Sequence, residues 1–248
     1  MPRTDWGWQV TAEELSTWII RHDDDLLVLN KPGLVVCHPS KHGPWSSLIG
    51  ACREYLGDAM LHMPSRLDRE TSGVIVFART REMGSRLQKA VQARQVRKSY
   101  LAILEGALLA PVCVDQPIGP ALASRVILRQ GVRPDGRPAR TYFEPLEWRG
   151  GYTLVRVRTE TGRLHQIRVH AAWLGHAVAA DKIYGPDEGL FLEFIEQGFN
   201  ARLRELLPME RQALHAEEMV FDLAEGPMEF RAALAADMVE FWQRLGCS

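Results

Sequence analysis

Strand-like and helical segments follow one another in irregular order along this 248-residue chain, and this order constrains its fold more than any other feature. Two segments repeat apolar side chains at helical spacing, residues 83–91 and 165–174. Four apolar runs are typical of strands, at residues 26–30, 74–78, 100–104 and 152–159. Because the order is not a series of βαβ units, we expect an α+β fold with a mixed, largely antiparallel sheet and flanking helices.

Turn and cap signals mark where some segments begin and end. Lys-Pro-Gly at residues 31–33 follows the first strand-like run, and we expect residues 34–37 to form a second strand after this turn. Thr11 and Glu14 have the spacing of a capping box, which predicts a short helix after Thr11. No repeat, low-complexity tract or Gly/Ser linker divides the chain, so we expect one domain over residues 1–248.

The charges of the chain are unevenly distributed, although 30 basic and 31 acidic residues give a net charge of -1. Residues 187–240 hold thirteen acidic and four basic side chains, whereas residues 79–98 hold seven basic side chains and one acidic. A cationic stretch of this kind suits a face that binds a phosphate backbone. By default, however, it is a solvated helix face.

Absent motifs exclude several classes of protein. The chain has no H-E-x-x-H, Walker A or Rossmann glycine pattern, so we expect neither a metal nor a nucleotide cofactor, and no G-x-S-x-G supports a serine hydrolase. It has no signal-peptide pattern and no run approaching the ~20 apolar residues that span a bilayer. Four cysteines without regular spacing (Cys37, Cys52, Cys113 and Cys247) fit reduced thiols, and we expect a cytoplasmic protein.

The densest group of reactive side chains lies directly before the 74–78 strand. There Asp68 stands between Arg66 and Arg69 on a loop that enters the sheet, and catalytic groups tend to lie on such loops. The alternative is an ordinary surface turn in which Asp68 pairs with one of the two arginines and orders the backbone. Composition alone favours the turn.

Three other segments carry candidate residues, each with a structural alternative. Arg168 follows the Gly-containing turn at 160–165 and could grip an anion, or could pair with a nearby carboxylate. Tyr100, at a strand start, is in most proteins a half-buried core residue. His215, in the apolar setting Leu-His-Ala, is in most proteins structural.

Taken together in this order, the four segments resemble the RluA-type RNA pseudouridine synthases. The central signature of that family looks like Arg-Leu-Asp-x-x-Thr-Ser-Gly before an apolar strand, and residues 66–73 match it. The other matches are residues 25–34, 98–102 with Gly106, 161–170 with 175–176, Asp181, 184–185 and 214–216. Together they cover residues 20 to about 222.

This resemblance implies a pseudouridine synthase catalytic fold, a sheet with a central active-site cleft, and an isomerase that converts uridine to pseudouridine in ribosomal RNA or tRNA without a cofactor. Asp68 would be the catalytic carboxylate, which adds to the base or sugar or stabilises charge on the ribose. Arg168 would keep that carboxylate ionised. Tyr100 would stack on the uracil, and its hydroxyl would help to remove the proton at C5.

Recognition of RNA would fall to cationic residues around this centre. Arg66 would fill the gap that a flipped uridine leaves. The further RNA-binding residues that we expect are Lys89, Arg94, Arg97, Lys98, Arg163 and His165. Since only about twenty residues precede the first motif, we expect no separate RNA-binding domain of the S4 kind. Recognition by the catalytic domain alone fits a compact stem-loop target, so we favour tRNA slightly. We expect the protein to act as a monomer, without an obligatory protein partner and away from membranes.

Three features depart from the family pattern. Ser65 replaces the usual histidine, Ala180 replaces a glycine, and residues 189–207 match no motif. Two rival functions also remain open. One is an inactive RNA-binding or RNA-folding module on the same fold. The other is a carboxylate glycosidase, which needs a second acid, and Glu70 is the nearest in sequence.

Overall fold

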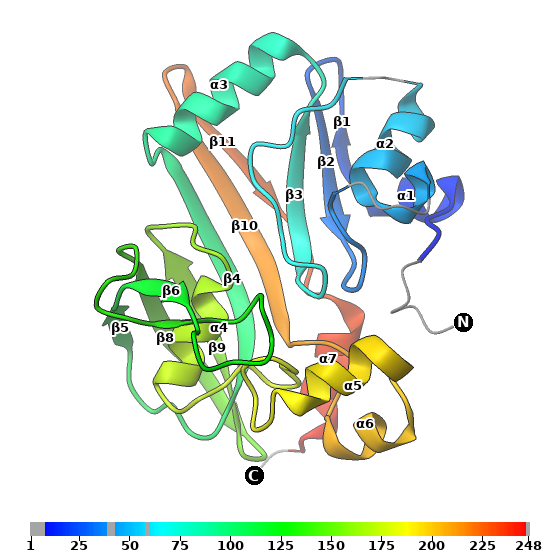
Figure 1. Ribbon diagram of the computed structural model, residues 1–248. Helices are drawn as coiled ribbons and strands as arrows, with labels where there is room; N and C mark the ends of the chain where they lie inside the picture. Colours follow the sequence, from blue (N-terminus) through cyan, green and yellow to red (C-terminus); the bar gives the residue numbers. More distant parts are fainter. Residues whose placement is uncertain (1–7, 39–42, 58–59, 247–248) are drawn as a thin grey trace. The chain divides into compact units, whose positions relative to one another are not determined.

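The computed structural model describes residues 8–38, 43–57 and 60–246. The chain divides into two compact units (Figure 1). Unit 1 comprises residues 1–98 and 216–233, and unit 2 comprises residues 99–215 and 234–248. Strands and helices mix in both units, as the irregular order of segments predicts, so the α+β class is confirmed.

Two of the three boundaries between the units fall within strands. One of these lies in β4 (Val96–Glu105) and the other in β10 (Leu214–Leu223), so each of these strands contributes one end to each unit. The third boundary lies between β11 (Gly226–Arg231) and α7 (Ala236–Arg244).

Unit 1 is built on strands in the order β1-β2-β3-β10, with β11 (Gly226–Arg231) paired to β10. β1 (Ile19–His22) pairs antiparallel with β2 (Leu26–Lys31), and β2 pairs antiparallel with β3 (Ser72–Ala78). Every residue of β3 is buried, as are all but one of β2. Since both faces of these strands are covered, they read in the sequence as continuous apolar runs.

The helices of unit 1 are α1 (Ala12–Trp18), the short 3-10 helix η1 (Pro44–Ser46), α2 (Leu48–Leu56) and α3 (Arg81–Gln92). The predicted capping box at the start of α1 is present. Met83, Leu87 and Ala90 of α3 pack against one core with side chains of β2, β3 and β10. Its polar face points to solvent, as the periodicity predicts.

The prediction of a strand at residues 34–37 is wrong. The carbonyls of this segment are bound by partners that do not belong to a strand. Lys31 Nζ donates to Val35 O, and the amides of Leu48 and Ile49 at the start of α2 donate to Val36 O and Cys37 O. The apolar side chains are buried, but helix α2 and a lysine bind the backbone.

Unit 2 is built on strands in the order β4-β9-β8-β5, where β5 is Val112–Asp115, β8 is Arg140–Arg149 and β9 is Tyr152–Thr159. The β4–β9, β8–β9 and β5–β8 pairs are antiparallel. Along β9 the burial alternates, with Val155 and Val157 in the core and Arg158 exposed.

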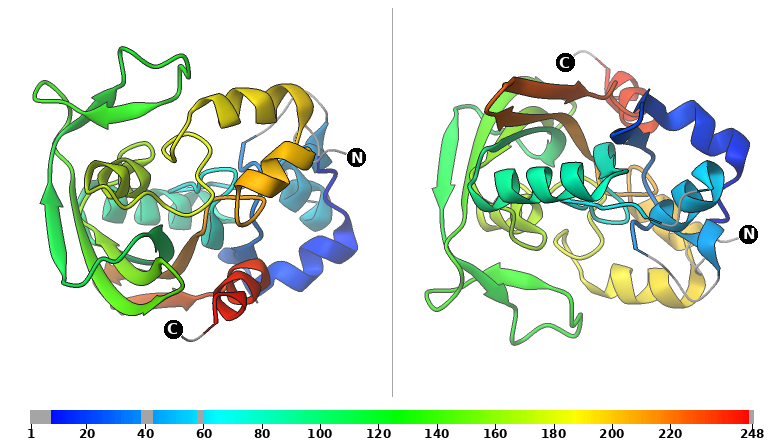
Figure 2. Two further views of the ribbon diagram at one scale, coloured as in Figure 1. Left: turned by 90° about the horizontal axis from the view of Figure 1, so that it is seen from below. Right: turned by 90° about the horizontal axis from the view of Figure 1, so that it is seen from above.

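A separate two-stranded hairpin extends from this unit. β6 (Ile118–Pro120) and β7 (Gln130–Val132) pair antiparallel, and residues 121–129 connect them. Both views in Figure 2 show the hairpin (green) at the edge of unit 2 with α5 (Gly189–Gln197, yellow) beside it. We call residues 118–132 the β6–β7 hairpin.

The helices of unit 2 cover its core. They are α4 (Gln166–Trp173), α5, α6 (Ala201–Leu206) and α7 (Ala236–Arg244). The 189–207 stretch, which matched no motif, forms α5 and α6, and its Phe194 and Leu203 are core residues. This stretch therefore has at least a packing role. Within the ranges that the structure describes, no helix combines the length and apolar character that crossing a membrane requires.

Helix α4 is more deeply buried than the helical spacing of its apolar side chains indicates. Ile167 and Ala171 enter the core as expected, but the polar Gln166, Arg168 and His170 are buried too. Gly175 follows the helix with φ 83°, the left-handed conformation expected of a residue that ends a helix. Each buried polar side chain of α4 therefore needs a defined partner.

Candidate active site

Asp68 lies in unit 1 on the loop directly before β3, and both of its neighbours are held through their backbone. Cys37 Sγ donates to the carbonyl of Leu67 at 3.3 Å, and Lys31 Nζ donates to the carbonyl of Arg69 at 3.0 Å. Asp68 itself is partly exposed. The sequence therefore presents Asp68 on a fixed loop.

The ammonium group that holds this loop is fully buried. Lys31 has no exposed surface, and its Nζ also donates to Pro32 O at 2.8 Å and Val35 O at 2.9 Å. A buried charge is costly unless it is hydrogen-bonded, and three carbonyls match the three N–H groups of a lysine. Arg69 adds a further hydrogen bond between the Asp68 loop and residues 31–35, because its Nε donates to Leu34 O at 3.3 Å.

The end of β3 nearest this loop requires a glycine. Gly73 has φ 110°, and a Cβ there would lie 2.2 Å from the carbonyl oxygen of Ala216 in β10. Only a residue without a side chain allows the two backbones to approach so closely. Gly73 thus fixes where the strand leaves the Asp68 loop.

Charges of both signs surround Cys37 beneath the loop. Burial raises the pKa of this thiol; the positive charges of Lys31 and Arg66 lower it, and the negative charge of Asp68 raises it. Arg66 is exposed, and its NH1 lies 2.9 Å from His38 Nε2. Because a guanidinium can only donate, His38 accepts at Nε2. Asp68 thus lies in an environment with at least two cations.

Arg168 lies in unit 2, in the first turn of α4, and is bound to Asp181. Its Nε donates to Asp181 Oδ2 at 2.6 Å and its NH2 to Oδ1 at 2.8 Å. Burial alone would raise the pKa of Asp181, but Arg168 and the amides of Tyr184 and Ile183 together hold it below its ordinary value. The structural alternative, a pairing of Arg168 with a nearby carboxylate, is therefore confirmed for Asp181. This pair fixes the guanidinium in one orientation.

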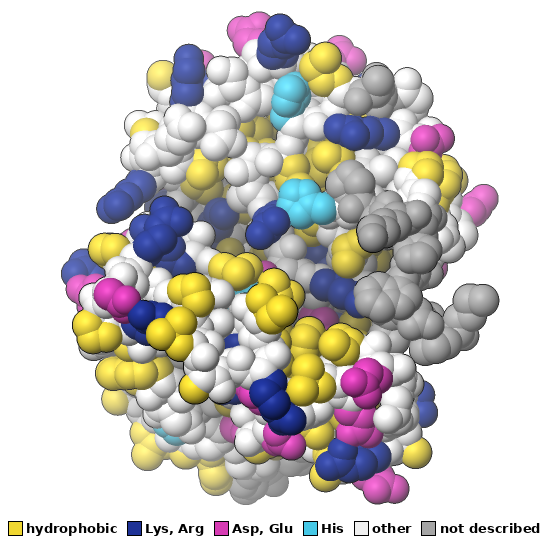
Figure 3. All heavy atoms as spheres, viewed as in Figure 1, with side chains coloured by type: hydrophobic (Ala, Val, Ile, Leu, Met, Phe, Trp, Pro, Cys, Tyr) yellow, Lys and Arg dark blue, Asp and Glu magenta, His cyan; other side chains and the backbone are white. Residues whose placement is uncertain are grey.

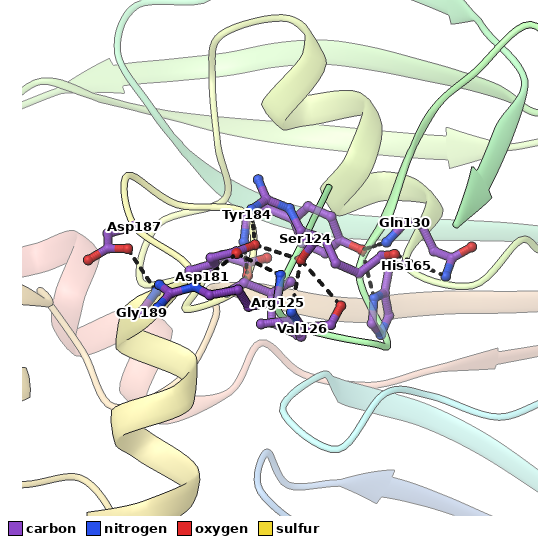
Figure 4. A network of polar contacts seen from close by, with 12 residues as sticks. Ser124, Arg125, Val126, Gln130, His165, Asp181, Tyr184, Asp187 and Gly189 are labelled. Carbon is purple, nitrogen blue, oxygen red and sulfur yellow. Dashed lines mark hydrogen bonds and ion pairs between the residues drawn. The ribbon is translucent and has the colours of Figure 1, made fainter. Parts of the chain in front are cut away.

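Tyr184 covers the face of the same guanidinium. Its ring centroid lies 4.9 Å from Arg168 Cζ, and its hydroxyl is 2.8 Å from His165 Nδ1. The backbone N–H of Gln130, in β7, donates to the hydroxyl at 2.8 Å. Figure 4 shows Tyr184 with Gln130 and His165 on one side and Asp181 on the other.

The turn that leads into α4 is held by one amide side chain. Gln166 Oε1 accepts from Thr161 Oγ1 at 2.7 Å and from the amide of Arg163 at 3.1 Å, while its Nε2 donates to Arg140 O at 2.9 Å. His165, between turn and helix, has φ 55°, a left-handed conformation rare for a residue with a side chain. The turn therefore sets the direction in which His165 and Arg168 leave the backbone.

Tyr100 lies in the part of β4 that belongs to unit 2. It pairs with Val157 of β9, is partly buried and packs against the core of that unit. The half-buried setting that the sequence suggested for it is confirmed, and this setting leaves part of the ring accessible.

The predicted catalytic residues are divided between the two units. Asp68 and Arg66 share a loop of unit 1, whereas Tyr100 and Arg168 belong to unit 2. The structure brings Arg168 and His165 together on Tyr184. The grouping of Asp68 with Tyr100 and Arg168 stays a prediction.

The predicted RNA-binding residues differ in how accessible their side chains are to a ligand. Lys89 and Arg94 are exposed. Arg97 is ion-paired with Asp222 at 2.9 Å, although 66% of its side chain is exposed. Lys98 is partly buried, and burial lowers the pKa of its ammonium to about 8. Arg163 Nε donates to Pro138 O at 2.9 Å, and His165 contacts Tyr184.

Sequence analysis did not identify the segment that connects the strands of the β6–β7 hairpin. Ser124 Oγ and Arg129 NH1 each donate to Glu188 at 2.6 Å, while Ile127 is 94% exposed and Arg125 68% exposed. Figure 3 shows hydrophobic and cationic side chains next to one another over the region of this hairpin. The only signal in the sequence is an apolar triplet between two arginines, which has no strand or helix periodicity.

An open cavity of about 810 Å³ lies between the hairpin and α4. Its lining includes Trp173 of α4, Tyr184 and Glu188, together with residues 120–124 and 129–135 of the hairpin and the segment that follows it. Within unit 2, the hairpin and α4 therefore form opposite walls of one groove.

Comparison with known sequences places this arrangement among RNA-modifying enzymes. Residues 25–173 match the family model described as RNA pseudouridylate synthase. The chain is 35% identical over 240 residues to ribosomal large subunit pseudouridine synthase D of Vibrio vulnificus (strain CMCP6), covering 94% of this chain and 72% of the relative. It is 36% identical over 240 residues to the Yersinia pestis protein of that name, covering 92% and 70%.

Solved structures show the same fold at lower identity. The human protein RNA Pseudouridylate Synthase Domain Containing 4 superposes with a TM-score of 0.72 at 24% identity, covering 94% of this chain and 95% of the human chain. The human RNA Pseudouridylate Synthase Domain Containing 1 gives a TM-score of 0.68 at 23% identity, with 92% and 93% covered. At these identities the likeness concerns the fold.

Proposed function

Because the chain belongs to the RNA pseudouridylate synthase family, and so isomerises uridine to pseudouridine in RNA, we propose that Asp68 is the carboxylate that carries this reaction. The resemblance to the RluA-type synthases is confirmed by the relatives of about 35% identity. The observation that supports this role is the setting of Asp68. The residue is partly exposed, and the carbonyls of its neighbours Leu67 and Arg69 accept hydrogen bonds from the buried side chains of Cys37 and Lys31. A fixed carboxylate can act without reorganising during the reaction.

The reaction exchanges one bond to the ribose for another. The bond between uracil N1 and ribose C1′ breaks, a bond between uracil C5 and C1′ forms, C5 loses its proton and N1 gains one. Asp68 would form a covalent adduct with the base or the ribose, or stabilise the positive charge at C1′. Arg168 would hold Asp68 ionised, and Tyr100 would stack on the uracil and accept the C5 proton. The grouping of these three side chains belongs to the proposal.

The cationic residues around this centre would bind the RNA. Arg66, next to Asp68 and exposed, would occupy the place of the flipped uridine, while Lys89 and Arg94 on α3 would contact phosphates. The remaining residues in this role are Arg97, Lys98, Arg163 and His165. The tip of the β6–β7 hairpin, with exposed Arg125 and Ile127, combines a cation with an apolar side chain and offers a second contact for RNA.

Ribosomal RNA of the large subunit is the first substrate to test, since the relatives carry that substrate in their names. A tRNA stem-loop, which the sequence slightly favoured, is the second. We further propose that the chain acts in the cytoplasm, as a monomer and as one catalytic domain.

The experiment is tritium release from RNA labelled at uridine C5. Large-subunit ribosomal RNA and total tRNA are offered separately to the native protein, to Asp68→Asn and to Asp24→Asn, which alters an exposed carboxylate elsewhere in unit 1. We expect release with the native protein and Asp24→Asn, and a loss of at least about a thousandfold with Asp68→Asn. Full activity of Asp68→Asn would contradict the assignment, and binding of RNA without release by the native protein would favour the inactive module.

A further inference from the structure

The β6–β7 hairpin is anchored to the rest of unit 2 at two places. At its tip, Glu188 accepts hydrogen bonds from Ser124 Oγ and Arg129 NH1, each at 2.6 Å, and from the amide of Arg125 at 3.0 Å. At its base, the amide of Gln130 donates to the hydroxyl of Tyr184 at 2.8 Å. A two-stranded hairpin is only marginally stable by itself, so its position depends on anchors of this kind.

Tyr184 contacts Arg168 with a different part of its side chain. The ring centroid lies 4.9 Å from Arg168 Cζ, and Tyr184 as a whole is 5% exposed. The amide of Tyr184 donates to Asp181 Oδ1 at 3.0 Å, the oxygen that also accepts from Arg168 NH2. Arg168 therefore has a carboxylate at its edge and an aromatic ring over its face, and both come from residues 181–184.

The hydroxyl makes hydrogen bonds with two different partners. It accepts from the Gln130 amide and shares its second bond with His165 Nδ1 at 2.8 Å. Replacing Tyr184 by phenylalanine would remove both bonds and leave the ring in place. Replacing it by leucine would remove the ring as well. The ring centroid also lies 5.6 Å from Cζ of Arg129 in the hairpin. Tyr184→Phe therefore isolates the hydroxyl, whereas Tyr184→Leu removes the ring from Arg168 and Arg129 together.

We propose that Tyr184 is a positioning residue with two separable roles: its ring orients the Arg168 guanidinium, and its hydroxyl holds the β6–β7 hairpin in place to meet the RNA. The first role rests on the proposed part of Arg168 in the reaction. The second rests on contacts within unit 2 and can be measured without activity. Tyr184 itself touches neither substrate nor reacting atoms in this proposal.

The test compares Tyr184→Phe and Tyr184→Leu with the control Tyr142→Phe. Tyr142 lies on strand β8, and the control removes its hydroxyl, which donates to Glu160. Trypsin cleavage after Arg125 and Arg129, followed by mass spectrometry, reports on the hairpin. Steady-state tritium release gives kcat and KM for RNA, and thermal unfolding gives the stability of each variant.

We expect Tyr184→Phe to be cleaved in the hairpin about fivefold to tenfold faster than the native protein and to show a KM raised by a similar factor, with kcat within about twofold. Tyr184→Leu should in addition lose about tenfold in kcat, because the guanidinium loses its ring. Tyr142→Phe should match the native protein throughout.

Two results would overturn the proposal. Tyr184→Phe that equals the native protein in cleavage and KM would show that the hydroxyl does not hold the hairpin. The second result is a fall in kcat and a rise in KM that follow the loss of thermal stability in both Tyr184→Phe and Tyr184→Leu. If the two variants do not differ in which constant changes, the tyrosine has only a structural role. Full activity of Arg168→Lys would instead refute the proposed function of Arg168, while the cleavage result would still decide the role of the hydroxyl.

Discussion

A single buried lysine fixes the loop that carries Asp68. Lys31 has no exposed surface and binds three carbonyls, one of them at Arg69, 38 positions away in the chain. Sequence reasoning identified the Asp68 segment because its residues are contiguous. It could assign Lys31 only to a turn, since the contact that gives the lysine its role is long-range.

Substitution of Lys31 tests this role at the residue scale. Lys31→Met keeps much of the side-chain volume but leaves the carbonyls of Pro32, Val35 and Arg69 without their donor. We expect the free energy of unfolding to fall by about 3 kcal/mol, because hydrogen bonds to charged groups are the stronger ones. Urea unfolding measures this.

Lys89→Met, on the exposed face of α3, is the matched stability control and should unfold as the native protein does. In the Lys31 variant, tritium release should fall by about tenfold where the protein is still folded, as the loop loses its anchor. An unchanged midpoint for Lys31→Met would mean that the ammonium does not hold the loop.

Elements with a clear periodicity were predictable, and elements held by distant contacts were not. The strand over 152–159 has the predicted bounds, and α3 extends the predicted helix by one to two residues at its ends. Residues 34–37 were predicted as a strand, because apolar content alone does not reveal that α2 and Lys31 bind their carbonyls. The β6–β7 hairpin was not predicted, since its position depends on Glu188 and Tyr184, more than fifty residues away in sequence.

The anchor at the hairpin tip should respond to acid. Hydrogen bonds from Ser124, the Arg125 amide and Arg129 lower the pKa of Glu188 from 4.5 to about 2. Since the folded pKa lies below the unfolded value, the stabilisation is present above about pH 4.5 and is lost as the pH falls towards 2. The hairpin should therefore be held at neutral pH and released in acid.

Hydrogen exchange at the amides of Arg125 and Arg129 measures this release. At pH 7, Glu188→Gln should exchange faster there than the native protein, and the difference should shrink between pH 4.5 and 2. Glu240→Gln, an exposed carboxylate on α7, serves as control. A difference that is independent of pH would show that the charge of Glu188 is not what holds the tip.

At the scale of the whole molecule, two buried cysteines report on the folding of unit 1. Burial raises the pKa of the Cys37 thiol, and it raises the pKa of the Cys52 thiol to about 12. Cys113 of unit 2 is exposed. Cys247 lies outside the described residues. In a variant with Cys113→Ser and Cys247→Ser, a thiol reagent at pH 8 should react only after unfolding.

Because β4 and β10 continue from one unit into the other, we expect the chain to unfold in one transition. The urea midpoint for thiol exposure in the Cys113→Ser, Cys247→Ser variant should coincide with the midpoint for circular dichroism, which reports on both units. Two separate midpoints would show that the units unfold independently. The single domain expected from the sequence stays a prediction until this is measured.

The interleaving of the units along the chain also has a consequence for synthesis on the ribosome. Residues 1–98 emerge first. In unit 1, β3 lies between β2 and β10, and the part of β10 that belongs to this unit is made only after residues 99–215. Until then one edge of β3, the strand that follows Asp68, has no partner, and an unpaired edge of an apolar strand is prone to aggregation. During synthesis, the N-terminal part of this enzyme therefore keeps an exposed strand edge until β10 has been translated. Chaperone binding and translation speed should for this reason affect the yield of folded protein.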